Sequence, residues 1–415
     1  MSFVRTDRFA GMADQAFLSA VTFGQVVLYA RHMTHDDFGL FAMGLATVLL
    51  GQTVQRCVVV LPMIVSAGET AESQTSAWSR LNLIVLTSGM AILLMGLAVG
   101  ALADLRSTLA WRVGALTLCM LPGSLLYEFV RRAHYVAGRR RAVLRMAATS
   151  LVLHAGVVWG VLAMGGDAFA AGLGTSGAAA LAALLSWPAG QPEAKGRMIV
   201  VGALVRRYRS DIVWNLAASL PYAGFNTAMP VVLGFLSSPT AAGVFSATRV
   251  LLAPITTLIS SIDSVDKPRA AKALRDHGEA GLARSLRGTT KSLFAWGSGY
   301  LVVGVLFSDQ ILRLLLGGRY PLDAGYQWCW FIVGALMMLG QPMETGLLVL
   351  RLTRYYFWTR LAALLASMAV LGFGLLSFTY EAGIFAVATG WMVSGTLACA
   401  LLVRRLGVGN EQPRE

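Results

Sequence analysis

VLYARHMTHDDFGLFAMGLATVLL (residues 27–50) has a counterpart in the second half of the chain, VVLGFLSSPTAAGVFSATRVLLAP (residues 231–254). Each stretch holds the end of one apolar segment, a short polar connection and the start of the next segment. The two stretches align without a gap, with Gly39 opposite Gly243 and Phe41 opposite Phe245. The pattern predicts two repeats built from apolar helices.

The repeat extends over most of the chain. Glu128 lies opposite Glu344, and Phe169 lies opposite Phe385 at the same spacing. Of the 415 residues, 56% are hydrophobic and 13% are charged, whereas about a quarter are charged in a soluble domain. We therefore predict an all-α polytopic membrane protein of about twelve spanning helices. The predicted spans are residues 11–30, 38–64, 81–103, 109–130, 146–164, 168–187, 212–235, 241–263, 292–312, 327–350, 361–378 and 383–403.

The basic residues indicate the orientation of these helices. If both termini lie on the same side of the membrane, 27 of the 34 Lys and Arg residues fall on that side. The opposite connections hold Arg31, Arg106, Arg112, Arg313 and Arg319. Positive connections stay in the cytoplasm, so we expect both termini there, in a multi-pass protein of the cell inner membrane. This distribution also accounts for the net charge of +13, and we expect no nucleic-acid partner.

Six helices in each repeat give two parallel, pseudo-symmetric lobes. We predict an N-terminal lobe at 1–190, a cytoplasmic linker at 191–211 and a C-terminal lobe at 212–415. Residues 264–291, between two spans, are predicted to form an amphipathic helix on the cytoplasmic surface. Parallel repeats with a site between them are common in transporters. A transporter is therefore the function that the fold class favours.

Other functions lack their usual motifs. The chain has no GxxxxGK[ST] stretch, no apparent Ser/His/Asp arrangement and no long connection that would hold catalytic groups. Its four cysteines lie in apolar segments and form no CxxC pair, so we expect neither a disulfide nor a metal site. We expect a transporter and not an enzyme.

Several short motifs resemble those of a known family. The connection RHMTHDDFGLFAMG contains Arg31, Asp37, Phe38 and Gly39, which match a typical stretch between the first two helices of the polysaccharide flippases. The second half has AAGVFSAT and LLLGGRYPLDAG, where Gly317 or Gly318 and Tyr320 fit a second family pattern. The chain resembles the O-antigen and exopolysaccharide branch of the multidrug/oligosaccharidyl-lipid/polysaccharide exporter superfamily along nearly its whole length. Many members have fourteen helices or longer connections, and this chain is shorter.

The resemblance implies a V-shaped pair of six-helix lobes. It also implies that a polyprenyl-diphosphate-linked oligosaccharide is flipped from the cytoplasmic to the periplasmic leaflet, in polysaccharide or lipopolysaccharide biosynthesis. Glycosyltransferases and a polysaccharide polymerase are the partners that such a function implies. Two alternatives stay open: a cation-coupled multidrug exporter of the same fold, and a membrane-embedded polysaccharide-assembly enzyme.

A diphosphate substrate calls for cations and polar groups inside the membrane. Arginine suits it, because its planar fork of donors binds phosphate and keeps its charge. Arg56 and Arg249 lie inside predicted spans, where a charge costs roughly 2.5–3.5 kcal/mol and is usually functional. We predict a substrate site made by these arginines and nearby amides, namely Arg56, Arg249, Gln52, Gln55, Asn215 and Asn226.

Export also needs an energy source, for which protons or sodium ions are candidates and no other cofactor is expected. The acidic residues in or at the ends of spans are the candidate coupling groups, namely Asp14, Glu128, Glu344 and Asp263. Each is equally compatible with an ion pair to Arg56 or Arg249. The seventh span contains Pro221 and ends near Pro230, which predicts a bend there.

Overall fold

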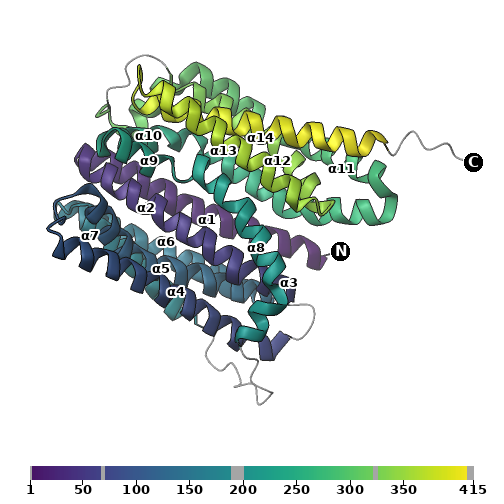
Figure 1. Ribbon diagram of the computed structural model, residues 1–415, viewed down its shortest axis with the longest axis horizontal. Coiled ribbons are helices and arrows are strands. Elements are labelled where there is room, and N and C mark those ends of the chain that lie inside the picture. Colours follow the sequence, from purple (N-terminus) through teal and green to yellow (C-terminus); the bar gives the residue numbers. More distant parts are fainter. Residues whose placement is uncertain (1, 67–70, 188–200, 321–325, 409–415) are drawn as a thin grey trace, which may run out of the picture. The chain divides into compact units, whose positions relative to one another are not determined.

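The computed structural model describes residues 2–66, 71–187, 201–320 and 326–408, and these residues form helices joined by short connections, as Figure 1 shows. The α-helices are α1 (Ser2–His32), α2 (His35–Gln55), α3 (Leu61–Ser66), α4 (Ala71–Leu102), α5 (Leu109–Val136), α6 (Arg140–Ala163), α7 (Ala168–Leu185), α8 (Val201–Asn226), α9 (Met229–Leu236), α10 (Pro239–Thr248), α11 (Ala253–Leu316), α12 (Cys329–Val349), α13 (Thr353–Gly374) and α14 (Tyr380–Val408). A π-helix, η1 (Arg56–Val60), joins α2 to α3, and a 3₁₀-helix, η2 (Arg249–Leu252), joins α10 to α11.

The lengths and hydropathy of the helices agree with the predicted class of multi-span membrane protein. In the described part of the chain, nine helices are long and apolar enough to cross a membrane, or ten if α8 and α9 form one bent span. The run Pro239–Leu316 passes as one such helix, although the sequence predicts two spans inside it. The predicted all-helical, multi-span fold is confirmed.

The chain forms two compact units. Unit 1 comprises Met1–Ala223 and Pro230–Gly243, and unit 2 comprises Gly224–Met229 and Val244–Glu415. The chain therefore leaves unit 1 within α8, returns to it in α9, and leaves it again within α10. Our division of the sequence into lobes at residues 190 and 212 stays a prediction about the repeats, and most of its linker, 188–200, lies outside the described residues.

Unit 1 is held together by close helix packing. Helix α5 packs against α7 and α2, and α1 packs against α6. A Cβ atom on Gly123 of α5 would lie 1.9 Å from the carbonyl oxygen of Ser176 on α7, so only glycine permits this approach. Small residues at helix contacts are the usual means of close packing in membranes.

The repeat-related glycines meet at one crossing in unit 1. A Cβ atom on Gly39 of α2 would lie 1.9 Å from the carbonyl oxygen of Pro239, and one on Gly243 of α10 would lie 3.2 Å from the Cα atom of Gly39. Thr240 donates a hydrogen bond of 2.5 Å to Asp36 beside this crossing. The alignment made from sequence thus pairs two residues that contact each other.

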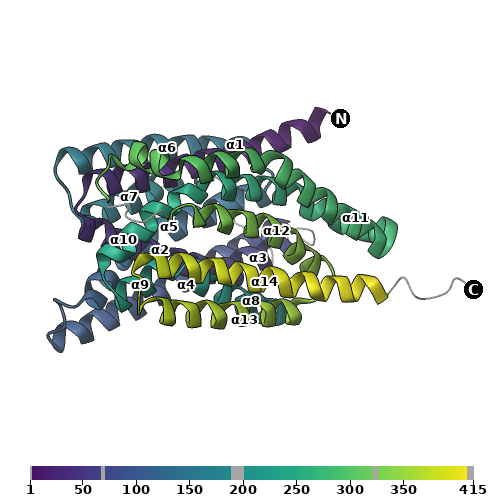
Figure 2. The ribbon, with the colours of Figure 1, turned by 90° about the horizontal axis from the view of Figure 1, so that it is seen from above.

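In unit 2, helix α14 packs between α12 and α13, as Figure 2 shows. Helix α11 turns back on itself at Gly278, whose φ of 62° and ψ of −156° are not helical. Thr289 after the turn donates to Asp266 before it, at 2.7 Å. The prediction of one surface helix at 264–291 is therefore wrong: both sides of Gly278 are helical, but they form a hairpin.

Candidate functional site

Arg56 begins the π-helix that interrupts the second span. It lies eight residues from the Ile64 end of the span His35–Ile64, which corresponds to about 12 Å along a helix. Its side chain is exposed, and it makes no ion pair with a described residue. Single turns of π-helix in α-helices are frequent at functional sites.

The two glutamines near Arg56 have different surroundings. Gln52 is half-buried and lies one turn before Arg56, on the same face of the helix. Gln55 is fully buried, and its Nε2 donates to Asn82 Oδ1 at 2.8 Å and to the Leu125 carbonyl at 2.7 Å. Gln55 therefore joins α2 to α4 and α5, so we leave it out of the proposed binding surface.

Arg249 stabilises the break between α8 and α9, whose residues 224–229 belong to unit 2 as Arg249 does. Its guanidinium donates to the backbone carbonyl of Asn226 at 2.6 Å and to Asn226 Oδ1 at 3.1 Å. Asn226 ends α8, and the axes of α8 and α9 differ by 52°. The last carbonyls of a helix lack partners within it, so Arg249 satisfies a group that the break exposes.

Asn226 is itself engaged on a second side. It is buried, and Trp391 donates to its Oδ1 at 3.4 Å. Asn215 is half-buried on the preceding part of α8. The structure thus gives Asn226 a role in the packing of unit 2 and leaves Asn215 and Gln52 as the predicted amides that no described hydrogen bond engages.

In unit 1, Arg131 of α5 lies at the centre of a buried charge network. It donates to Asp14 of α1 at 2.8 Å and to Glu128 at 2.7 Å. Arg132 also donates to Glu128, at 2.7 Å, and Tyr135 donates to Asp14 at 2.7 Å. The network joins α1 to α5 and contains as many basic as acidic groups.

In unit 2, Glu344 of α12 is the centre of a second network. Arg360 of α13 donates to it at 2.8 Å, Tyr356 of the same helix at 3.2 Å and Ser394 of α14 at 3.0 Å. The guanidinium of Arg360 also lies over the ring of Tyr356, 4.0 Å from its centroid. One carboxylate therefore holds three helices together.

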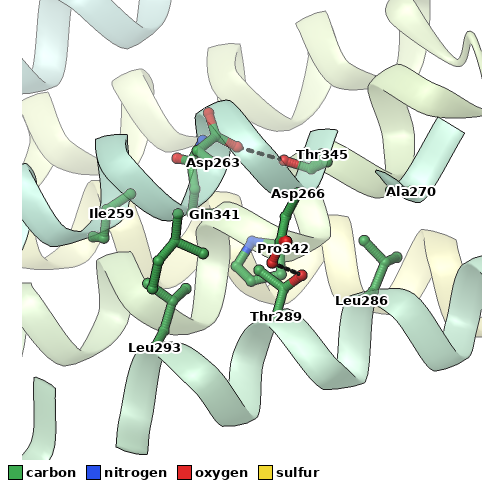
Figure 3. A pocket seen from close by; sticks show the side chains of 11 residues that line it. Ile259, Asp263, Asp266, Ala270, Leu286, Thr289, Leu293, Gln341, Pro342 and Thr345 are labelled. Atoms are coloured by element: carbon green, nitrogen blue, oxygen red, sulfur yellow. Dashed lines mark hydrogen bonds between the residues drawn. The ribbon is translucent and has the colours of Figure 1, made fainter. Parts of the chain in front are cut away.

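The fourth candidate carboxylate, Asp263, lies in a small pocket of unit 2 between the two arms of α11 and α12, shown in Figure 3. It accepts a hydrogen bond of 3.2 Å from Thr345 and pairs with Lys267. In the described part of the chain, no group of three or more His, Cys, Asp or Glu residues is arranged to hold a metal ion.

In the described part of the chain, only one of the four coupling candidates has a carboxylate oxygen that accepts no hydrogen bond. Both oxygens of Glu128, Glu344 and Asp263 accept hydrogen bonds or ion pairs. Asp14 is 2% exposed, and its Oδ1 has no hydrogen-bond partner among the described residues. A buried polar atom without a partner is uncommon in proteins, so this oxygen distinguishes Asp14 from the other three candidates.

The sequence interpretation missed the basic partners. Pairing of Glu128 or Glu344 with Arg56 or Arg249 was an open alternative, but both glutamates pair with other arginines. For Glu128 a signal was present, since Arg131 and Arg132 follow it at the three- and four-residue spacings of one helix face. Arg360 comes from a different helix, and no local pattern points to it.

No family model matches the chain, and no curated protein matches it in sequence. Solved structures do match. A multidrug resistance MATE family transporter of the MOP superfamily, in its outward-facing conformation, is 13% identical, with 98% of this chain and 95% of that chain covered and a TM-score of 0.60. The lipid II flippase MurJ, in its inward closed conformation, is 13% identical, with coverages of 95% and 87% and a TM-score of 0.66.

A third match has a stated difference in its site. A MOP superfamily transporter from Pyrococcus furiosus, with a binding pocket of reversed polarity, is 11% identical, with coverages of 98% and 95% and a TM-score of 0.62. The chain thus has the fold of MOP superfamily transporters, with two lobes and multiple membrane spans. At these identities the likeness establishes the fold alone, and both drug exporters and a lipid flippase share it.

Proposed function

We propose that this protein flips a polyprenyl-diphosphate-linked oligosaccharide from the cytoplasmic to the periplasmic leaflet of the cell inner membrane, by alternating access, in polysaccharide export. The fold supports a transporter, and the lipid II flippase is an example of a lipid-linked substrate carried by a protein of similar fold. Both termini are cytoplasmic in this proposal, and glycosyltransferases and a polymerase are the partner enzymes.

The observation that carries the proposal is the contrast between acidic and basic groups inside the spans. Asp14, Glu128 and Glu344 are each neutralised by an arginine of their own unit. Arg56 is exposed at membrane depth and pairs with no described carboxylate. A mid-helix arginine costs roughly 2.5–3.5 kcal/mol, and an anionic ligand offsets that cost. A diphosphate is such a ligand.

A cation-coupled multidrug exporter is the second candidate, because MATE transporters have a similar fold. Lipophilic cations call for acidic groups without a basic partner, and Asp14, Glu128, Glu344 and Asp263 are each paired with a basic residue. A pocket of reversed polarity also occurs within this superfamily, in the Pyrococcus furiosus transporter. We do not propose a polysaccharide-assembly enzyme, since the fold is that of transporters.

For the coupling group we propose Asp14. Proton or sodium coupling needs a carboxylate that can change its hydrogen-bond partners. Among the four candidates, only Asp14 has a carboxylate oxygen that accepts no hydrogen bond from a described residue. The test is Asp14→Asn in proteoliposomes with an imposed proton or sodium gradient. We expect gradient-driven transport to be lost and substrate binding to be retained. Gradient-driven transport at the wild-type rate would exclude Asp14.

The function itself is tested by leaflet translocation of a fluorescent polyprenyl-diphosphate oligosaccharide in proteoliposomes. Losing a charge-assisted hydrogen bond is worth about 1.5–3 kcal/mol, so we expect Arg56→Ala to reduce translocation on the order of tenfold to a hundredfold. Arg56→Lys keeps the charge without the fork of donors and is expected to recover part of the rate.

The matched control is Arg106→Ala, which removes the same charge from an exposed position between α4 and α5. It should translocate at the wild-type rate. Equal loss in Arg56→Ala and Arg106→Ala would contradict a binding role for Arg56. If the wild type translocates no lipid-linked sugar but exports lipophilic cations, the drug-exporter candidate replaces the proposal.

A further inference from the structure

The first turns of α8 form an extension that precedes the predicted span at residue 212. Leu204, Tyr208 and Ile212 recur at a spacing of four residues and are buried in the core cluster of unit 1. The ring of Tyr208 lies 5.8 Å from that of Trp78 on α4. The extension is therefore fixed against unit 1, and Figure 1 shows it beside α3.

The exposed surface around this buried line is basic. Arg206, Arg207 and Arg209 are all exposed, and Asp211 is the one acidic residue between Val201 and Trp214. The guanidinium of Arg207 lies 5.7 Å from the centroid of the Tyr208 ring, which orients it on the anchored side chain. We call these three residues the arginine stripe.

The position of the stripe along α8 matches the depth of lipid headgroups. Val213 is 53% exposed and Trp214 is 37% exposed at the start of the span, and exposed tryptophan marks the membrane interface. Arg209 and Arg206 lie five and eight residues before Trp214, which is about 7–12 Å along a helix. The polar layer of a bilayer is roughly 5–8 Å thick on each side, so Arg209 lies at its outer part and Arg206 just outside it, within reach of a long side chain.

We propose that the arginine stripe binds the headgroups of anionic phospholipids and thereby fixes the membrane-proximal end of α8. Arginine matches a phosphate through its fork of donors, and each basic residue near an anionic surface adds to the attraction. The occupant is a phospholipid because the stripe lies beside an exposed apolar and aromatic surface. This proposal does not depend on the transported substrate.

The test is native mass spectrometry of the purified full-length protein with phosphatidylglycerol, or with phosphatidylcholine as the zwitterionic comparison. The variant is R206Q/R207Q/R209Q. The matched control, R106Q/R112Q/R313Q, removes three charges from other exposed positions. We expect the stripe variant to bind phosphatidylglycerol on the order of tenfold to a hundredfold more weakly. The control variant should bind it like the wild type.

Three outcomes would overturn the proposal. They are an equal loss in both variants, no loss in the stripe variant, and no preference of the wild type for phosphatidylglycerol over phosphatidylcholine. A parallel titration with undecaprenyl diphosphate separates the two sources of phosphate. If the stripe variant loses only that ligand, the stripe belongs to a substrate pathway and the proposal fails. Circular dichroism and gel filtration establish that both variants are folded.

Discussion

Glu128 and Glu344 occupy corresponding positions in the two repeats, but their surroundings differ. Glu344 is 1% exposed and joins three helices, with every donor coming from α13 or α14. The side chain of Glu128 is 16% exposed, and its own partners lie on its own helix. In unit 2 the glutamate at this position therefore binds side chains of two other helices directly. In unit 1 the glutamate binds only its own helix, and Arg131 makes the contact with Asp14 of α1.

This difference separates stability from function. A fully satisfied carboxylate between three helices cannot change partners without loosening all of them. Asp14 shares the network of unit 1 and retains an oxygen without a donor in the described structure. We therefore expect substitutions around Glu344 to affect folding most, and substitutions around Glu128 to affect it less.

The largest effect is expected for Glu344→Gln. The substitution leaves the charge of Arg360 buried without its counterion, and breaking a buried pair in this way costs about 3–5 kcal/mol. The measurement is the free energy of unfolding in mixed micelles as the denaturing detergent is increased.

A double variant separates the effect of the ion pair from the effect of the volume that its two side chains fill. Replacing both partners, as Glu344→Leu with Arg360→Met, should recover most of the lost stability, because two apolar side chains leave no unpaired charge. If the double variant is no more stable than Glu344→Gln, the ion pair is not the source of the effect.

A smaller effect is expected for Glu128→Gln. Arg131 keeps its bond to Asp14, and the site is more accessible to water, so we expect a loss of about 1–2 kcal/mol in the same unfolding measurement. A loss of stability as large as that of Glu344→Gln would contradict the difference between the repeats, because it would mean that the two glutamates contribute equally to folding.

The smallest effect is expected for Arg132→Gln. The side chain is 28% exposed and pairs with Glu128 within one helix, at the four-residue spacing. Such pairs contribute about 0.3–0.5 kcal/mol. The change in unfolding free energy should fall near the error of the measurement and diminish further in high salt. A loss above about 1 kcal/mol would show that Arg132 belongs to the buried part of the network.

Much of the fold was predictable because the membrane restricts the chain to helices of a certain length. Hydropathy located most of the spans, although α1, where the first was predicted, is not among the described helices apolar enough to cross a membrane. The repeat paired Gly39 with Gly243, which contact each other. The hairpin in α11 was missed, although Gly278 supplied a signal, because helical periodicity continues on both sides of it.

The candidate site was predictable only in part. The polar residues of the spans were identifiable from composition, but their partners were not. Gln55 bonds to two other helices and Arg249 bonds to the end of α8, and each contact depends on tertiary packing or on a helix break. The sequence shows which charged residues lie inside a span, where a charge is costly. Only the packing of the helices shows which groups neutralise each of those charges.

The way the chain passes between its two units has a consequence for biosynthesis. Residues 230–243 belong to unit 1 but follow residues 224–229, which belong to unit 2. A ribosome has therefore translated well over half of the protein before the first unit is complete. Cutting the chain between α7 and α8 would leave an N-terminal fragment that lacks part of its own unit. The two pieces should then behave as complementing fragments that require each other to fold.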